Sequence, residues 1–574
     1  MTKLPKENAQ FRVLYREFLF RMVDLEVLAP QGDMSKLLGQ FAGLLIFVSF
    51  WLAYFTTAIA GSQKGSLAGV LVIWTVEHFL IATTMLAVGF FTVMSWDATF
   101  PDRRDVLVLS PLPIRSRTLL LAKAAGVASA LSITVLALNA FTGLIEPFVF
   151  ASGQGFFLPA LRSLAAYWIT MLGAGVFIFG SVLGVQGLAQ LLPRQWFLRV
   201  SSWLQTVLFF LWVTVYVLQP PFSEVGDLVA SQRVLRWLPS YWFFGLFQQL
   251  QGFIAPELAF LARRAWTGLA VAGCSAAAAY LICYFRTLRK IAEQPDILPG
   301  QGGRSVLGAG LPRFGNSLET AVGHFSVRTL LRSRQHRVIL SFYLGTGLGL
   351  GMFIAKVPEL YQAASARGAW YRANAPLLVA SILIVCAAVL GTRVVFSMPL
   401  EVRANWIFRV MPLPGTPACL AAGRRSLYAL AVAPILAGSA ALFLWLWPWK
   451  AALGHLAYLV LLATILAELC LHGFHKLPFT CSYLPGKTQF HMAVMYLALL
   501  LITLSWAAER EMDALSSGTL YAIVLLGLAA VAVLARWRTT AGAKSEEVKL
   551  QFDEAPAPAI FALDLHRDGI TPFE

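Results

Sequence analysis

Residues 67–94 read LAGVLVIWTVEHFLIATTMLAVGFFTVM, an apolar run in which only Glu77 and His78 are ionisable. A helix needs about 20 apolar residues to cross the hydrocarbon core of a bilayer. This run is long enough, so it predicts a membrane-spanning helix. The chain contains eleven further runs of similar length, and together they predict an all-α, polytopic transmembrane bundle of about twelve spans. The other runs lie at 38–60, 118–145, 163–190, 200–219, 256–284, 337–356, 375–398, 425–447, 451–473, 489–508 and 517–536.

The composition of the 574 residues agrees with a membrane protein. Hydrophobic residues make up 58% and charged residues only 13%, with a mean hydropathy of +0.69, whereas soluble proteins carry roughly 25% charged residues. This excludes a soluble enzyme, a disordered chain and a secreted disulfide module. The six cysteines lie in or beside apolar runs, as small buried hydrophobes do.

The net charge of +16 follows the predicted topology. With the N-terminus inside the cell, most Lys and Arg fall in the inner loops, which is the positive-inside bias. We therefore expect a multi-pass protein of the cell membrane with both termini cytoplasmic and no removable signal peptide. The basic residues form no patch interleaved with stacking aromatics, so no nucleic-acid partner is expected.

A weak internal repeat divides the chain. A shift of about 300 residues brings Pro111-Leu112-Pro113 onto Pro412-Leu413-Pro414, in the loops after the second and eighth spans. Six spans per half give both halves the same orientation, hence a parallel repeat. The predicted parts are an amphipathic connecting helix on the inner membrane surface (1–37), a first six-span half (38–285), a cytoplasmic linker with a second amphipathic helix (286–336), a second six-span half (337–538) and a cytoplasmic tail (539–574).

The inner loop after the second span is the most unusual polar segment. It reads DRRDVLVLSPLPIRSR over 102–117, and the loop around Glu401, Arg403 and Arg409 repeats its plan. Fixed charges, an apolar stretch and a Pro-bounded stop suit a short helix that docks on a cytoplasmic partner. A solvated loop that only sets topology is the alternative. The candidate coupling residues are Asp102, Arg103, Arg104, Asp105, Pro111, Pro113, Arg115, Arg117, Glu401, Arg403, Pro412 and Pro414.

Ionisable side chains inside the spans are the second group of candidates. Glu77 and His78 are adjacent, and Glu468 and His472 are expected one helical turn apart on one face. A charge at bilayer depth is costly, so each pair needs a partner or a task. The alternatives are hydrogen bonds that fix helix packing, a polar contact with a transported head group, or a proton relay.

Other motifs predict no chemistry in the chain itself. Residues 481–488 end in Gly-Lys-Thr but have Cys481 where a P-loop needs its first glycine. Cys470, His472, His475 and Cys481 have zinc-type side chains, but their spacing does not bring them together. We therefore expect no catalytic residues, no metal and no cofactor in this chain.

The aromatic residues Trp237, Tyr241, Trp242, Phe243 and Phe244 are expected at the outer membrane interface, a re-entrant element being the alternative.

The surface helix YREFLFRMVD, the six spans per half and the segment SPLPIRSRTLLLAK resemble the type-two permease family of ATP-binding-cassette exporters. The resemblance implies a membrane unit paired with two copies of a cytoplasmic ATPase subunit, which would hold the ATP and magnesium. It also implies that YREFLFRMVD and the segment from Asp102 to Arg117 contact those subunits. The second half departs from the pattern, because PLEVRANWIFRVMPLPGTP lacks the double-acid DRRD, and this predicts a weaker coupling site there.

Three functions are therefore weighed. The leading hypothesis is the permease subunit of an ATP-driven exporter that moves an amphipathic or lipid-like substrate, with membrane lipid and the ATPase as partners. The second is a proton-coupled secondary transporter with Glu77 or Glu468 as the carrier group. The third is a membrane-embedded protein that processes lipids or assists assembly.

Overall fold

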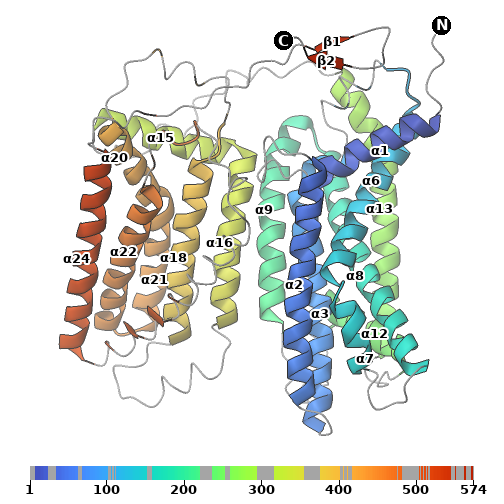
Figure 1. The fold of residues 1–574 in the computed structure, drawn as a ribbon, viewed down its shortest axis with the longest axis horizontal. Coiled ribbons are helices and arrows are strands. Elements are labelled where there is room, and N and C mark those ends of the chain that lie inside the picture. The colour runs from blue at the N-terminus through green and yellow to red at the C-terminus, as the bar shows by residue number, and fades with distance from the viewer. Residues whose placement is uncertain are drawn as a thin grey trace. The chain divides into compact units, whose positions relative to one another are not determined.

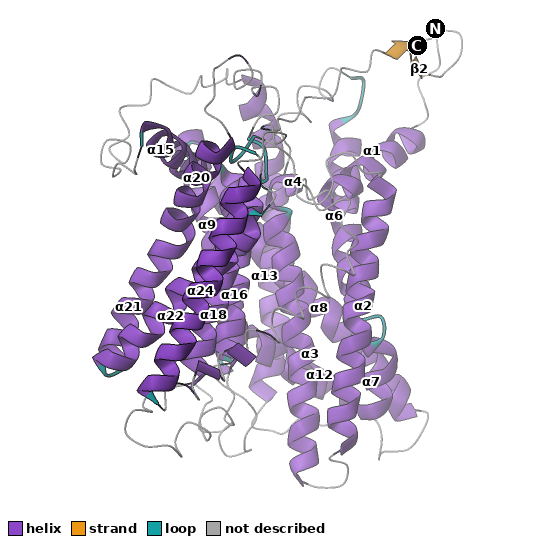
Figure 2. Cartoon of the chain, turned by 60° about the vertical axis from the view of Figure 1, so that its left-hand side comes forward, coloured by secondary structure: helices purple, strands orange, loops and turns teal. Residues whose placement is uncertain are grey.

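The computed structural model of the chain describes residues 7–23, 34–62, 67–100, 105, 109, 112–150, 158–219, 235–252, 259–293, 316–354, 375–400, 405, 410, 416–472, 474, 476–480, 503, 506–507, 510–511, 514, 517–543, 550, 561–563 and 570–572. Long helices account for most of these residues, with two short strands near the C-terminus (Figure 2). The chain divides into two compact units, Met1–Gly303 with Pro485–Phe490, and Arg304–Leu484 with His491–Glu574.

The first unit is a helical bundle in which α1 lies across the ends of α2 and α6 (Figure 1). Helix α8 packs against α3, α6, α12 and α13, so it is the central helix of this unit. The elements are α1 (Glu7–Val23), α2 (Met34–Ser62), α3 (Leu67–Met94), α4 (Trp96–Thr99), α6 (Ser116–Leu138), α7 (Thr142–Phe150), α8 (Leu158–Gln190), α9 (Arg194–Leu218), α12 (Pro239–Gln251) and α13 (Ala259–Glu293).

The second unit has a surface helix, α15, that packs against α20, while α18 and α24 each pack against α22. A π-helical turn, η3, joins α20 to α21, just before Pro434, whose ring and missing N–H interrupt the α-helical ladder. The elements are α15 (Ser317–Arg332), α16 (Arg334–Ile354), α18 (Ala375–Phe396), α20 (Thr416–Leu427), η3 (Tyr428–Val432), α21 (Ala433–Leu446), α22 (Trp449–Leu471), α24 (Gly518–Ala543), β1 (Phe561–Leu563) and β2 (Ile570–Pro572), the strands being antiparallel with Phe561 opposite Pro572.

Within the described residues, nine helical segments are long and apolar enough to cross a membrane, which confirms the prediction of a multi-span all-α protein. They are Leu38–Ile59, Gly69–Met94, Ser116–Leu138, Leu158–Gln190, Ala259–Tyr284, Leu377–Phe396, Thr416–Leu446, Trp449–Leu471 and Gly518–Gly542. The predicted run 200–219 forms the shorter apolar helix Trp203–Leu218, and 337–356 forms α16. The predicted span 489–508 lies almost wholly outside the described residues.

The third predicted span, 118–145, is wrong at its C-terminal end. Helix α6 stops at Leu138, where the Asn139 side-chain amide donates to the backbone oxygen of Val135 at 2.9 Å. A new short helix, α7, begins at Thr142 and contains Pro147. Asn139 also bonds Thr84 and Tyr167, so a buried polar network marks the break.

Small residues set the closest helix contacts in each unit. A Cβ atom built on Gly187 of α8 would lie 2.4 Å from the Cβ of Ala279 on α13. A Cβ on Gly347 of α16 would lie equally close, at 2.4 Å, to the Cβ of Ala387 on α18. Glycine is required at both positions because membrane helices gain their packing energy from close backbone approach.

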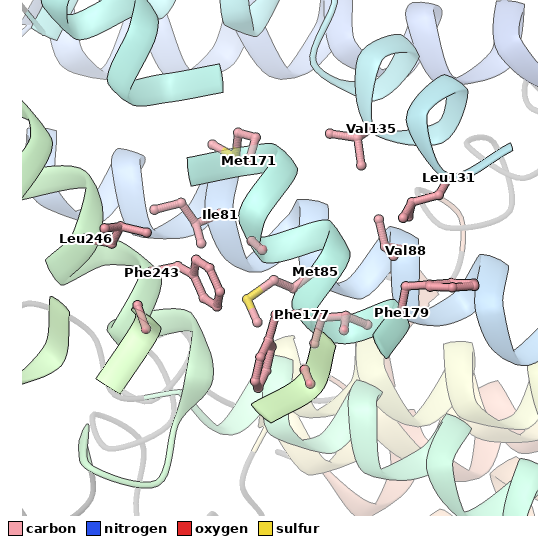
Figure 3. Packing of buried hydrophobic residues seen from close by; sticks show 14 of the residues in the cluster. Ile81, Met85, Val88, Leu131, Val135, Met171, Phe177, Phe179, Phe243 and Leu246 are labelled. Atoms are coloured by element: carbon pink, nitrogen blue, oxygen red, sulfur yellow. The ribbon is translucent and has the colours of Figure 1, made fainter. Parts of the chain in front are cut away.

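The core of the first unit joins α3, α6, α8 and α12. Figure 3 shows Ile81, Met85 and Val88 of α3 facing side chains of the other three helices. Phe177 of α8 and Phe243 of α12 are in aromatic contact, with ring centroids 5.5 Å apart. Helix α12 is therefore an integral part of the bundle.

Candidate functional site

The segment that follows α3 is held by several helices of the first unit. We call residues 93–100 with Asp105 the loop hub. The Trp96 side chain is buried, and its indole Nε1 donates to Ser201 Oγ of α9 at 3.0 Å. The backbone oxygen of Trp96 accepts a bond from Gln186 Nε2 of α8 at 2.7 Å. These bonds fix the start of the loop to α8 and α9.

Three further side chains bind backbone oxygens of the loop hub. Gln205 Nε2 of α9 donates to Val93 at 2.6 Å, and Tyr280 of α13 donates to Thr99 at 3.3 Å. Lys123 Nζ of α6 donates to Phe100 at 2.8 Å. Side-chain donors satisfy carbonyl groups that the ends of α3 and α4 would otherwise leave unpaired. The loop hub is consequently attached to α6, α8, α9 and α13.

Asp105 adds an ionic connection. Its Oδ2 lies 2.7 Å from Lys123 Nζ, and its Oδ1 binds Arg21 Nη1 of α1. The Asp105 and Lys123 side chains are only 2% and 4% exposed. A charge in such surroundings requires a partner. We call Arg21, Asp105 and Lys123 the Asp105 clasp, and it joins the loop hub to both α1 and α6.

Helix α1 completes this arrangement. Its apolar face packs on α6, where Leu14 and Phe18 meet Leu119 and Ala122. The side chains of Leu14 and Phe18 are thus covered by α6. Arg12 and Arg16 remain on the exposed face.

The predicted coupling residues of the first half divide into two groups. Asp105 is buried, so it positions the loop and does not lie on a surface that a partner could touch. Pro113, Arg115 and Arg117 are exposed immediately before and at the start of α6. Asp102, Arg103, Arg104 and Pro111 lie outside the described residues.

In the second half, the predicted residues Glu401, Arg403, Pro412 and Pro414 lie outside the described residues, as does Arg409. Asn405 is described and buried, and its side-chain Nδ2 donates to the backbone oxygen of Thr480. The loop after α18 is therefore attached to the segment that follows α22.

Phe479 strengthens that attachment. Its N–H donates to Phe396 O at 2.8 Å and its carbonyl accepts from Leu400 N–H at 3.0 Å. Its φ of 65° lies in the left-handed region, which is uncommon for a bulky residue. The ring packs on Phe325, His336 and Phe396. Several contacts thus hold a costly backbone conformation at the junction of two loops.

Glu77 and His78 bind α12 to α3. Gln248 Nε2 donates to Glu77 Oε2, and His78 Nε2 lies 3.1 Å from Ser240 Oγ. The His78 ring stacks on Tyr241 at 4.0 Å between centroids. Among the alternatives for this pair, the structure supports hydrogen bonding that fixes helix packing.

The prediction of an aromatic belt is wrong for three of its five residues. Tyr241, Phe243 and Phe244 are at most 1% exposed and belong to the core of the first unit. Trp237 is 81% exposed, and Trp242 is partly buried. The pattern of aromatic residues alone could not distinguish a helix face exposed to lipid from one that packs against other helices.

Glu468 and His472 do not share a helix face. Helix α22 ends at Leu471, and His472 is an exposed cap with extended backbone. Glu468 is fully buried, where its carboxylate lies 2.6 Å and 3.0 Å from Nε and Nη2 of Arg424. Thr539 Oγ1 of α24 also donates to Glu468 at 2.5 Å. The cluster ties α20, α22 and α24 together.

Sequence reasoning missed a buried chain of polar groups in the second unit. His455 Nε2 lies 2.7 Å from Ser381 Oγ, and His455 Nδ1 lies 2.7 Å from Glu511 Oε1, which also accepts from Tyr521. The order Ser, His, Glu matches a hydrolase triad, but His455 and Glu511 have no exposed side-chain surface. All three side chains are therefore packed inside the second unit. The position of His455 inside the apolar run 451–473 was the available signal.

A small hollow opens in the first unit between α3, α9 and the start of α12. Apolar side chains line most of it, including Met85, Leu86 and Val215. Tyr216 and Ser240 also line it, and their hydroxyls bond Thr83 and His78 respectively. The indole N–H of Trp212, another lining residue, has no acceptor in the described part of the chain. The hollow thus combines apolar walls with uncharged polar groups.

The remaining motifs lie mostly beyond the described residues. His475 and Cys481 are not described, and neither is the segment 481–488 with its partial P-loop pattern. Among the described residues, no three His, Cys, Asp or Glu side chains are grouped so that they could hold a metal ion.

Comparisons with protein-family models, with curated proteins and with solved structures gave no match for this chain. The chain is a multi-span helical membrane protein, and its architecture is consistent with a transporter.

Proposed function

We propose that the chain is the membrane-spanning permease subunit of an ATP-driven exporter that moves an amphipathic or lipid-like substrate. In this proposal the twelve spans form two parallel six-span repeats in the cell membrane, with both termini cytoplasmic. Two copies of a separate cytoplasmic ATP-binding-cassette subunit bind ATP and magnesium. The chain itself carries no catalytic group.

The loop hub is the observation that carries this proposal. A permease that is driven by a separate ATPase subunit needs a cytoplasmic element that this subunit binds. Displacement of that element must also displace the membrane spans. The segment after α3 bonds α6, α8 and α9 through Lys123, Gln186 and Gln205. The Asp105 clasp adds α1. Displacement of this loop therefore acts directly on α1, α6, α8 and α9.

The hollow between α3, α9 and α12 supports an amphipathic substrate. Its walls suit an acyl or aromatic group, and the unpaired Trp212 N–H suits a hydrogen-bond acceptor on the ligand. Helix α9 also contributes Gln205 to the loop hub. Movement of the loop hub can thus change the hollow through a helix that both share.

A pull-down tests the proposal. The tagged chain is extracted from its native membrane in mild detergent, and co-purified proteins are identified by mass spectrometry and assayed for ATP hydrolysis. We expect a nucleotide-binding subunit in stoichiometric amount. A chain that purifies alone and without ATPase activity contradicts the proposal.

Proton-coupled transport is the second candidate, favoured by the contact of His455 with Glu511. His455 Nδ1 and Glu511 Oε1 lie 2.7 Å apart, and neither side chain is exposed. Glu77 and Glu468, the carriers expected from the sequence, are instead engaged with Gln248 and Arg424. Purified chain in vesicles with an imposed proton gradient tests this candidate: uptake that His455→Gln abolishes supports it, and transport only in the presence of ATP and a partner excludes it.

A further inference from the structure

The two halves have a cationic side chain, Lys123 and Arg424, at the same place in the repeat. The acidic partner differs between them. Arg424 lies 301 positions after Lys123, the same shift that relates Pro111 to Pro412. Lys123 lies in the third turn of α6 and Arg424 in the third turn of α20. Both side chains are buried. The surface helices α1 and α15 pack on α6 and α20 respectively.

The second half has an amide near the repeat position at which the first half has the acid Asp105. Asp105 lies 300 positions before Asn405, and both are buried after a span. Asp105 accepts from Lys123 at 2.7 Å and from Arg21 of α1. Asn405 is an uncharged amide and donates to Thr480 O. At these two positions the first loop thus makes an ion pair, whereas the second makes a hydrogen bond to a neighbouring loop.

The cation of the second half, Arg424, binds residues of the membrane-spanning helices. Arg424 Nη2 donates to Glu468 Oε2 of α22 at 3.0 Å, and Arg424 Nε lies 2.6 Å from Glu468 Oε1 as an ion pair. Thr539 of α24 bonds the same carboxylate. Arg425, the next residue, binds Glu319 of α15. The charged groups of this unit thus connect spans and surface helix to one another.

We propose that the two halves couple to the ATPase unequally, and that Asp105, Lys123 and Arg21 are the positioning residues through which the first half alone transmits the partner's movement. This inference rests on the proposed function. The Arg424, Glu468 and Thr539 cluster holds the corresponding ends of α20, α22 and α24 as a fixed block. In this proposal the first half moves with its loop, whereas the helices of the second half stay fixed to one another.

Matched pairs of variants test this assignment in the full chain, co-purified with its ATPase subunit and placed in lipid nanodiscs. Asp105→Asn with Lys123→Met removes the first ion pair without leaving a buried charge, and Arg424→Met with Glu468→Gln removes the second. Arg21→Gln and Arg425→Gln form a milder pair that changes partly exposed side chains. An environment-sensitive fluorescent amino acid at Val215 reports on the hollow, and its emission is compared with and without ATP and orthovanadate.

We expect the nucleotide-dependent emission shift at position 215 to be lost in the Asp105/Lys123 variant and reduced in Arg21→Gln. It should persist in the Arg424/Glu468 variant and in Arg425→Gln, although the former lowers the melting temperature. The Asp105/Lys123 variant should still co-purify with the ATPase, because the exposed residues of the loop are unchanged.

Equal effects of the two pairs, or loss of the shift only in the second-half variants, overturn the unequal coupling. If the Asp105/Lys123 variant does not fold, the comparison of Arg21→Gln with Arg425→Gln decides the same question. Absence of any ATPase subunit from the wild-type preparation overturns the proposed function as well, so the two failures are distinguishable.

Discussion

Lys123 Nζ of α6 lies 2.7 Å from Asp105 Oδ2 in the loop after α3, and both side chains are shielded from solvent. Removing two charges from water is costly, so the pair contributes little net stability compared with two apolar residues. It makes the position of the loop specific, because Lys123 without Asp105 would be a buried charge without its counter-charge. The loop and α6 must consequently move as one body.

Asp105→Asn should destabilise the first unit strongly. The variant leaves Lys123 buried without its counter-charge, which costs about 3–5 kcal/mol in free energy of unfolding. The measurement is SDS titration of the detergent-solubilised chain, followed by circular dichroism. Arg117→Gln on the exposed start of α6 is the matched control and should shift the curve by no more than about 0.5 kcal/mol. Similar unfolding curves for both variants would show that the Asp105 clasp is not shielded from solvent.

Gly187→Ala should separate α8 from α13. The added methyl group would lie 2.4 Å from the Cβ of Ala279, so the helices must shift, at a cost of about 1–3 kcal/mol. Gly273→Ala on α13 is the control, because a Cβ there meets no atom within 4 Å. The apparent melting temperature should fall for Gly187→Ala only. A fall of the same size in both variants would argue against this helix contact.

Glu77→Gln should retain both the position of α12 and transport. A glutamine oxygen can still accept the bond from Gln248, whereas Glu77→Leu cannot. Protease protection of the 235–252 segment should therefore decrease only in Glu77→Leu. Abolition of transport by Glu77→Gln, with α12 still protected, would support a proton carrier at this position.

Stability should depend on pH through Glu146 of α7. Burial raises the pKa of this carboxyl group, although bonds from Thr56 and Thr57 partly oppose the shift. An acid whose folded-state pKa exceeds its unfolded value of about 4.3 contributes full stability below that pH, and the contribution is lost as pH rises through the folded pKa. Glu146→Gln should therefore flatten the decline in melting temperature between pH 4 and pH 8. Parallel declines in the variant and the wild type would refute the assignment.

Reversal of Arg103 and Arg104 to Glu should weaken binding of the ATPase subunit without unfolding the spans. These residues lie outside the described part of the chain, so the prediction rests on their place in the loop. Surface charge changes seldom alter stability by more than about 0.5 kcal/mol. Co-purification should decrease while the melting temperature stays constant. Undiminished co-purification would remove this part of the loop from the docking surface.

The spans could be predicted because each depends on its own apolar run. Residues 67–94 are an example, and the helix Leu67–Met94 coincides with that run. The break at Asn139 was not predictable in the same way, since its cause is a bond network with Thr84 and Tyr167 on other helices. Hydropathy reports the length of an apolar segment and not the tertiary bonds that interrupt it.

The candidate site was only partly accessible to sequence reasoning. The loop after α3 stands out by its charge, but the sequence does not reveal that Asp105 faces inward to Lys123 and Arg21. His455 and Glu511 lie 56 residues apart, so no local spacing relates them. Glu468 was expected beside His472, yet its partner is Arg424, 44 residues away. Long-range polar pairs need the fold before they can be recognised.

The most direct test of the central claim is photo-crosslinking from the loop in native membranes. A photoreactive amino acid at position 117, exposed at the start of α6, should crosslink to a nucleotide-binding subunit. The same group at position 237, 81% exposed beside α12, should not reach that protein. Crosslinks from position 117 to lipid alone, or to the same protein from both positions, would contradict the assignment of this loop as the point where an ATPase drives the permease.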